Sequence, residues 1–338
     1  MVNLKYLVLF ICFAQIFYYS AADNSTSIVG SIVDKVLPDC VFGVETISAF
    51  LYTRNIPDGV VLTVENITST DALEKCEFAD GIVCLAHGFI SSGNTSKLIE
   101  LTQALLKKFK LAVISFNWKQ AACSTGGLSL TDKIAYPKAV QNTPDVGQFV
   151  ANLTKIIIDK CNAKLDKMTM IGHSLGAHVM GFAGKEIQKL LPGKKYPQII
   201  GLDPAFPLFS TKDCAERLCK TDADFVQIIH TTRLFGISQA IGNVDFYMNK
   251  GHLQPDCNAN PTCSHSKAIS YLTETIEHEC CFIGTPWTNY FITKPISSCT
   301  KDTCVCVGLN ARDYPARGKF YVKIEHNYPY CNNNGTVL

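Results

Sequence analysis

The chain has 338 residues, of which 47% are apolar and 18% are charged, and its formal net charge at pH 7 is +2. This balance allows a sizeable buried core and excludes an intrinsically disordered chain, while the length suits one large domain or two small ones. A charge so close to zero gives no reason to expect a nucleic acid or an anionic membrane as partner.

The first 22 residues predict a secretory signal that is cleaved near Ala22. Lys5 precedes an apolar run, and the run ends on the small residues Ser20, Ala21 and Ala22. The alternative, a membrane anchor, is disfavoured because the apolar run is short. Removing this segment takes away one positive charge. Residues 23–39 carry no pattern that we can assign.

Cysteine content and glycosylation motifs also indicate export. Of the 16 cysteines, Cys12 belongs to the signal, and the odd remainder leaves at least one thiol free or bonded to another molecule. Zinc is disfavoured because no two C-x-x-C units occur at zinc spacing. We therefore expect a secreted, extracellular glycoprotein, with N-x-S/T sequons that begin at Asn24, Asn66, Asn94, Asn152 and Asn334.

Apolar, β-branched runs alternate with helical patterns through the first two thirds of the chain. Helical spacing occurs at residues 94–108 and 146–160, and the order strand–helix–strand predicts an α/β fold with a parallel sheet covered on both faces. No linker or repeat divides the chain, and the cysteine-dense tail from Cys280 is interpreted as an extension stapled to the same domain. Buried strands are expected at residues 81–88, 111–118, 167–174, 196–205 and 225–232.

A G-x-S-x-G motif lies between the third predicted strand and a run of small residues. It reads Gly172-His173-Ser174-Leu175-Gly176, and in this strand-to-helix context it predicts a sharp turn that exposes a nucleophilic serine. A turn without chemistry is the alternative interpretation of an isolated motif. The strand before it and the small residues after it favour catalysis.

A serine nucleophile needs a base, and the base needs an orienting acid, in the chain order Ser, Asp, His for this class of fold. Asp203 follows the next predicted strand and is our candidate acid, with Asp222, Asp224 and Asp245 as weaker rivals. His265 is the candidate base because it lies downstream of Asp203, beside a small cysteine loop. The other seven histidines are out of order or expected in packing and surface roles: His87, His173, His178, His230, His252, His278 and His326.

Two backbone amides are candidates for stabilising an oxyanion. His87-Gly88 ends the first predicted strand, and a turn at Gly88 allows the Phe89 amide to point inward; the Leu175 amide is the natural second donor. A simple strand-ending turn is the alternative interpretation of His87-Gly88.

Several segments together resemble the pancreatic lipase family: "AHGF", "GHSLGAH", "IGLDPA", "FVQIIHTT" and "CSHSKA". The stretches "HECCFIG", "CVCVGLNARDYPARGKFYV" and "YCNNNG" are similar to the insect venom phospholipases A1 of wasps and hornets in particular. The resemblance implies an α/β-hydrolase fold over residues 40–338, a triad of Ser174, Asp203 and His265, and oxyanion amides at Phe89 and Leu175. Since the chain stops soon after Cys331, we expect neither a C-terminal lipid-binding sandwich nor a colipase partner.

The resemblance also implies a disulfide pattern and leaves three cysteines, Cys76, Cys84 and Cys161, outside it. One extra bridge and one free thiol are therefore compatible with the sequence. The implied pairs are Cys40–Cys123, Cys214–Cys219, Cys257–Cys263, Cys280–Cys306, Cys281–Cys331 and Cys299–Cys304.

The Cys257–Cys263 loop corresponds to the lid, and its five enclosed residues are too few to cover a long apolar groove. The segment Thr231–Asp245 is also brief, so we expect an open site that favours phospholipids over triglycerides. Preference for the sn-1 ester is implied by the resemblance alone. A triglyceride or galactolipid lipase and a non-catalytic yolk-type lipid-binding protein remain as alternatives. We expect a monomer that needs no metal or cofactor.

Overall fold

The computed structural model describes residues 47–62, 81–122, 130–278 and 280–331 of the chain. Several predictions concern residues outside these ranges and are not tested there. They are the signal at 1–22, the segment 23–39, the Cys40–Cys123 pair, Cys76, and the sequons at Asn24, Asn66 and Asn334.

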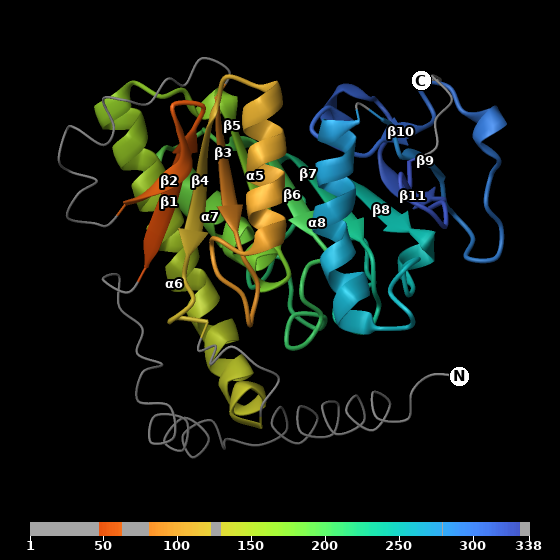
Figure 1. Ribbon diagram of the computed structural model, residues 1–338, viewed down its shortest axis with the longest axis horizontal. Helices are drawn as coiled ribbons and strands as arrows, with labels where there is room; N and C mark the ends of the chain where they lie inside the picture. Colours follow the sequence, from red (N-terminus) through yellow and green to blue (C-terminus); the bar gives the residue numbers. More distant parts are fainter. Residues whose placement is uncertain (1–46, 63–80, 123–129, 279, 332–338) are drawn as a thin grey trace.

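An eleven-stranded sheet forms the centre of the molecule, in the order β10-β9-β11-β8-β7-β6-β5-β3-β4-β1-β2 (Figure 1). All five predicted strands are present and parallel to one another. They are β3 (Ile82–Ala86), β4 (Ala112–Asn117), β5 (Met168–His173), β6 (Tyr196–Leu202) and β7 (Ala223–His230).

Six further strands extend the sheet on both sides. Two of them, β8 (Val244–Met248) and β11 (Gly318–Val322), continue the parallel part. Antiparallel pairing occurs towards the two edges. There β1 (Ser48–Thr53) pairs with β2 (Ile56–Leu62) and with β4, and β9 (Ile283–Pro286) pairs with β10 (Val305–Cys306) and with β11.

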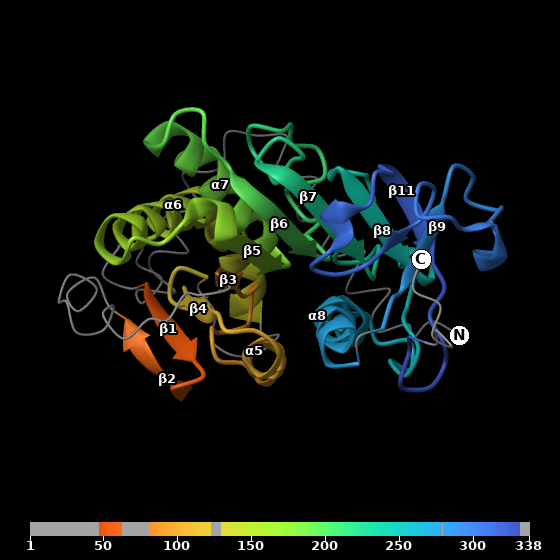
Figure 2. The same ribbon diagram turned by 90° about the horizontal axis from the view of Figure 1, so that it is seen from above.

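Within the described residues, four α-helices cover the two faces of the sheet, as the predicted α/β-hydrolase fold requires. Seen from above, α5 (Ser96–Lys108) and α8 (Pro261–Glu277) lie on one face, while α6 (Leu130–Cys161) and α7 (Leu175–Leu190) lie on the other (Figure 2). Burial on both faces explains the continuous apolar runs of the central strands, since every residue of β3 and β8 is buried. No helix in the described ranges combines the length and the apolar run that crossing a bilayer demands.

The helix predicted at 94–108 is confirmed as α5, but the one predicted at 146–160 is wrong in its start. Helix α6 begins at Leu130 and continues through Pro144. Proline lacks the amide that would bond the carbonyl four residues earlier, at Val140. The Thr143 hydroxyl donates to the Val140 carbonyl instead (2.8 Å). The helix therefore continues through Pro144, which we expected to lie before its start.

The tail from Cys280 is stapled to the same domain, as predicted, and it also supplies β9, β10 and β11 to the sheet. Its cysteines also correct the predicted pairing. We expected Cys280–Cys306 and Cys281–Cys331, but the bonds are Cys280–Cys331 and Cys281–Cys306. Three predicted pairs are present as expected: Cys214–Cys219, Cys257–Cys263 and Cys299–Cys304.

Alternation along an extended chain explains the exchanged partners, because adjacent side chains point to opposite sides. Cys281 lies in a small apolar cluster that includes Cys306. Cys280 faces the end of α8 instead, with its sulfur 3.8 Å from the Glu274 carbonyl oxygen. The Cys331 amide donates to the Glu274 carboxylate (2.8 Å), which brings Cys331 to the same side. Among the other described cysteines, Cys84 and Cys161 are free thiols.

Candidate active site

Ser174 occupies the sharp turn between β5 and α7. Its φ of 57° and ψ of −121° lie in a region that L-residues rarely adopt, which is typical of a nucleophile held at a strained elbow. Its amide donates to Leu202 O (3.0 Å) and its carbonyl accepts from Ala205 N (3.2 Å), so the turn is fixed to the end of β6. A Cβ at Gly176 would lie 2.2 Å from Ala86 O, so only glycine lets α7 start this close to β3.

The turn after β3 lies directly against the serine. A Cβ added to Gly88 would lie 2.7 Å from the Cβ of Ser174, so this backbone approaches the nucleophile as closely as glycine permits. The His87 ring fixes the turn: its Nε2 accepts from Trp118 N (3.0 Å), so its Nδ1 carries the proton and donates to Gly88 O (2.8 Å). His87, which is out of order for a catalytic base, therefore orients the Gly88 peptide.

Phe89 and Leu175 carry the two amides expected to face an oxyanion. The peptide between Gly88 and Phe89 is planar and trans, so holding its carbonyl toward His87 points the Phe89 N–H in the opposite direction. Leu175 is the first residue of α7, and such an amide has no acceptor within its own helix. Within the described part of the chain, neither amide donates to a protein acceptor, so both are available to a bound oxygen.

Asp203 and His265 form a hydrogen-bonded pair although 62 residues separate them. Asp203 follows β6 and is completely buried, and its Oδ2 lies 2.7 Å from His265 Nδ1. Its Oδ1 accepts from the amides of Thr231 (2.8 Å) and Thr232 (3.2 Å), the two residues that follow β7. The carboxylate is thus fixed by two backbone donors that the sequence could not identify, and its free oxygen orients the imidazole.

His173, the residue before Ser174, packs against His265. Its ring centroid is 4.6 Å from that of His265, and its Nε2 donates to His265 O (3.1 Å). Burial, reinforced by the neighbouring His265, lowers the pKa of His173 well below its usual range. A ring that stays neutral does not compete with His265 for a proton. Phe235 also packs against His265, with ring centroids 5.8 Å apart.

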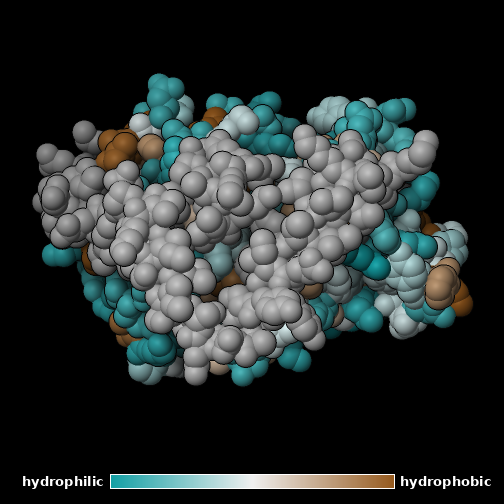
Figure 3. All heavy atoms as spheres, turned by 90° about the horizontal axis from the view of Figure 1, so that it is seen from below, coloured by the Kyte–Doolittle hydropathy of each residue, from teal (hydrophilic) through white to brown (hydrophobic). Residues whose placement is uncertain are grey.

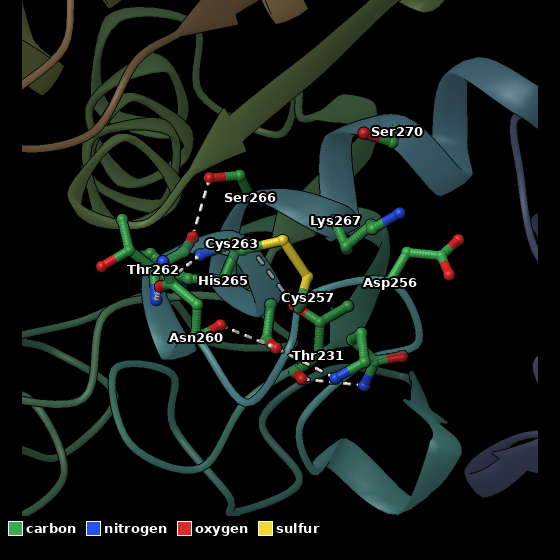
Figure 4. Close-up of a disulfide and its surroundings, with 12 residues drawn as sticks. Thr231, Asp256, Cys257, Asn260, Thr262, Cys263, His265, Ser266, Lys267 and Ser270 are labelled. Carbon is green, nitrogen blue, oxygen red and sulfur yellow. Dashed lines mark hydrogen bonds between the residues drawn. A yellow bond between two sulfur atoms is a disulfide. The ribbon is translucent and has the colours of Figure 1, made fainter. Parts of the chain in front are cut away.

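His265 lies on α8, a helix that the sequence analysis missed. Asn260 caps its start, where Oδ1 accepts from the amides of Thr262 (2.9 Å) and Cys263 (3.2 Å), and Pro261 occupies the first turn. The Cys257–Cys263 bond ties the incoming loop to this turn, as Figure 4 shows. The small cysteine loop and His265 are therefore parts of one rigid corner, and the pair Asn260-Pro261 is the signal that could have predicted the helix.

Gln254 fastens that corner to the end of the sheet. Its backbone amide donates to the Ser264 hydroxyl (2.9 Å), and its side-chain amide donates to the carbonyls of Thr231 and Met248 (both 2.8 Å). Its remaining oxygen accepts from the Tyr271 hydroxyl (3.0 Å). Because the Thr231 amide also holds Asp203, the buried Gln254 side chain links the support of this carboxylate to the helix that carries His265.

The rival acids have other partners. Asp222 pairs with Lys185 (2.6 Å), and Asp245 pairs with buried His230 (2.9 Å), while Asp224 is exposed. Within the described ranges, no three His, Cys, Asp or Glu side chains are grouped to hold a metal ion. The remaining histidines are exposed, as expected: His252, His278 and His326.

His178 is a second buried, neutral cross-link behind the elbow. Its Nε2 donates to Ala205 O (2.9 Å), its Nδ1 accepts from Leu218 N (3.2 Å), and its ring stacks on Phe209. Burial lowers the pKa of His178 to about 3 and that of His87 to about 4. Protonating either ring would remove an acceptor that a buried amide requires.

These two histidines predict that stability falls in mild acid. In the unfolded chain the pKa of a histidine is about 6.5. Between that pH and the lower pKa of the folded state, only the unfolded chain binds the proton. The free energy of unfolding is therefore highest above about pH 6.5 and falls as pH is lowered, by at most about 1.4 kcal/mol per pH unit for each histidine. In urea unfolding from pH 7 to 4.5, the His178→Gln variant should show a shallower slope than the wild type. The exposed His326→Gln variant is the matched control, and an unchanged slope in His178→Gln would contradict this account.

The geometry suits acyl transfer to water. A hydroxyl at a strained turn, an imidazole oriented by a buried carboxylate, and two amides with no acceptor among the described residues are the groups this reaction requires. The turn at Gly88 lies against Ser174, and the ring of the preceding residue, His173, packs against His265.

Comparisons with known proteins agree with this geometry. A family model described as Lipase matches residues 35–330. A phospholipase A1 from Polybia paulista is 49% identical over 99% of this chain and all of its own length. Phospholipase A1 1 from Polistes dominula and probable phospholipase A1 magnifin from Vespa magnifica are each 46% identical, again over 99% of this chain and 100% of their own.

Proposed function

The chain belongs to the lipase family, and from this premise we propose that it is a phospholipase A1, which hydrolyses the sn-1 acyl ester of glycerophospholipids. The observation that carries the chemistry is the Asp203–His265 pair beside the strained Ser174 turn. Near-full-length relatives named phospholipase A1 support the substrate class.

In the proposed reaction, Ser174 Oγ attacks the ester carbonyl while His265 Nε2 accepts its proton. The negative charge that develops on the carbonyl oxygen is stabilised by the amides of Phe89 and Leu175. His265 then protonates the departing lysophospholipid oxygen, and water hydrolyses the acyl-serine with His265 again as base. Asp203 keeps the proton of the imidazole on Nδ1 throughout.

Access to the site supports phospholipid over triglyceride as substrate. A long lid has to open before a triglyceride enters an apolar groove. We propose that the Cys257–Cys263 loop is the lid; it encloses five residues and is held by a disulfide and by the Asn260 cap. The segment Thr231–Asp245 is the second wall, and Ala205 pairs with Gly236 to hold it against the end of β6. Two short, fastened walls leave space for a bulky headgroup.

The alternatives differ from the proposal in substrate or in chemistry. A triglyceride or galactolipid lipase would use the same triad, so only the substrate separates it from a phospholipase. A non-catalytic lipid-binding protein would have no need for a strained serine beside an oriented imidazole.

Product analysis on a phosphatidylcholine with different sn-1 and sn-2 chains tests the proposal. We expect the sn-1 fatty acid and the 2-acyl lysophospholipid, with calcium chelator present, and much slower release from a triglyceride. Predominant release of the sn-2 chain, or faster triglyceride hydrolysis, would refute a phospholipase A1.

We also propose that the protein is exported and acts as a monomer without colipase. Five disulfides among the described residues fit an oxidising compartment. The sequon asparagines Asn94 and Asn152 are exposed and can accept a glycan.

A further inference from the structure

The loop of residues 287–298, between β9 and β10, carries an unusual set of exposed apolar side chains. Phe291 is 87% exposed, Ile292 is 64% exposed and Ile296 is 45% exposed. Hydrophobic spheres gather at the right-hand margin of Figure 3, at the end of the molecule that the C-terminal segment forms. Apolar side chains clustered on a protruding loop indicate an interaction surface rather than incidental exposure.

The loop is built to hold these side chains outward. Trp287 is buried at its base, with its ring 4.7 Å from that of Tyr247. Asn289 then forms a tight turn, in which its side-chain oxygen accepts from Phe291 N (3.0 Å) and its carbonyl accepts from Ile292 N (3.2 Å). Because both turn amides are already bonded, Phe291 and Ile292 are presented by a structured turn.

Cations surround the base of this turn. Arg233 lies over the Tyr290 ring at 4.6 Å and Lys250 lies 5.3 Å from the same ring, while Lys294 is exposed on the loop itself. None of the three forms an ion pair with a carboxylate in the described residues. An apolar tip with an aromatic ring and unpaired cations behind it matches the layers of a phospholipid surface, from acyl chains to phosphates.

The base of the loop lies at the same edge of the sheet as the candidate active site. Arg233 directly follows Thr231 and Thr232, whose amides hold Asp203, and Lys250 follows β8. The cationic base of the loop therefore lies at the carboxyl ends of the parallel strands, the edge of the sheet that carries the triad. A surface bound by the loop would meet this edge.

We propose that the 287–298 loop anchors the protein to phospholipid surfaces: Phe291 and Ile292 enter the acyl boundary, Tyr290 lies among the headgroups, and Arg233, Lys250 and Lys294 face phosphates. The proposal rests on the proposed function, because a membrane-bound substrate gives the anchor its purpose. A phospholipid surface fits these cations better than a second copy of the chain, which would need an acidic partner patch.

Vesicle co-sedimentation tests the anchor separately from catalysis. In a Ser174→Ala background, the Phe291→Ser/Ile292→Ser variant should bind phosphatidylcholine vesicles at least about tenfold more weakly, because two large apolar side chains lose their burial. The matched control is Val60→Ser/Val61→Ser, which removes two exposed valines from the edge strand β2 and should bind as the parent does.

With Ser174 intact, the same loop variant should lose vesicle hydrolysis by a similar factor but keep activity on a short-chain phospholipid below its micelle concentration. Unchanged vesicle binding would overturn the anchor. Unchanged binding together with lost self-association would overturn it and assign the loop to contact between copies. If the wild type binds vesicles through the loop but hydrolyses no phospholipid, the proposed function fails and the anchor stands.

Discussion

Replacing Ser174 with Ala is expected to lower kcat for fatty-acid release from phosphatidylcholine by roughly 10⁴–10⁶-fold. The hydroxyl is the only group at the turn that can form the acyl intermediate, and neither the oriented imidazole nor the two amides can replace it. Alanine keeps the Cβ, and Ser174 Oγ has no hydrogen-bond partner in the described ranges, so the fold should be unaffected. Free fatty acid should be measured by mass spectrometry, beside the thermal unfolding midpoint.

Ser210→Ala is the matched control for that substitution. Ser210 is a partly exposed serine on the loop that follows Asp203, and it should retain wild-type activity. Ser174→Ala protein that is folded and still hydrolyses phosphatidylcholine at a rate near the wild type would eliminate Ser174 as nucleophile.

Replacing Asp203 with Asn is expected to lower kcat by about 10⁴-fold while KM changes little. Asparagine has nearly the same shape and can still accept from the amides of Thr231 and Thr232. Its NH₂ group, however, would face His265 Nδ1 and force the ring proton onto Nε2. The ring could then no longer take the proton of Ser174. Steady-state kinetics on short-chain phosphatidylcholine would separate kcat from KM.

The matched control here is Asp224→Asn, at an exposed carboxylate on the neighbouring strand β7. It should behave as the wild type does. If Asp203→Asn kept activity within about tenfold of the wild type, another acid would have to orient His265.

The parallel strands and the serine elbow could be predicted because their sequence signals are local. Strands buried on both faces become continuous apolar runs, and an elbow needs small residues at fixed positions around Ser174. By contrast, β8 reads "VDFYM", and its Asp245 looks like a loop residue until its buried partner His230 is known. Helix α8 begins after the Asn260 cap with "PTCSHS". Because most of these residues are polar, the apolar spacing that would indicate a helix is absent from its first turns.

The contacts that hold the site residues in place could not be predicted from the sequence for a different reason. They join segments that lie far apart in the chain. The Thr231 and Thr232 amides, the His173–His265 contact and the orientation of the Gly88 peptide by His87 leave no local pattern. The exchanged partners of Cys280 and Cys281 have the same origin. Two adjacent cysteines are equivalent in sequence, and only the side to which each one points in the folded chain decides between them.

Trapping the acyl intermediate with a covalent mimic tests the central claim most directly. An alkylphosphonate ester that imitates an sn-1 acyl group should phosphonylate the protein once, with loss of phospholipase activity in proportion. Peptide mapping should find the added mass on Ser174, and Ser174→Ala protein should remain unlabelled. Labelling of another residue, or full activity with Ser174 labelled, would contradict the account of Ser174 as the nucleophile that Asp203 and His265 serve.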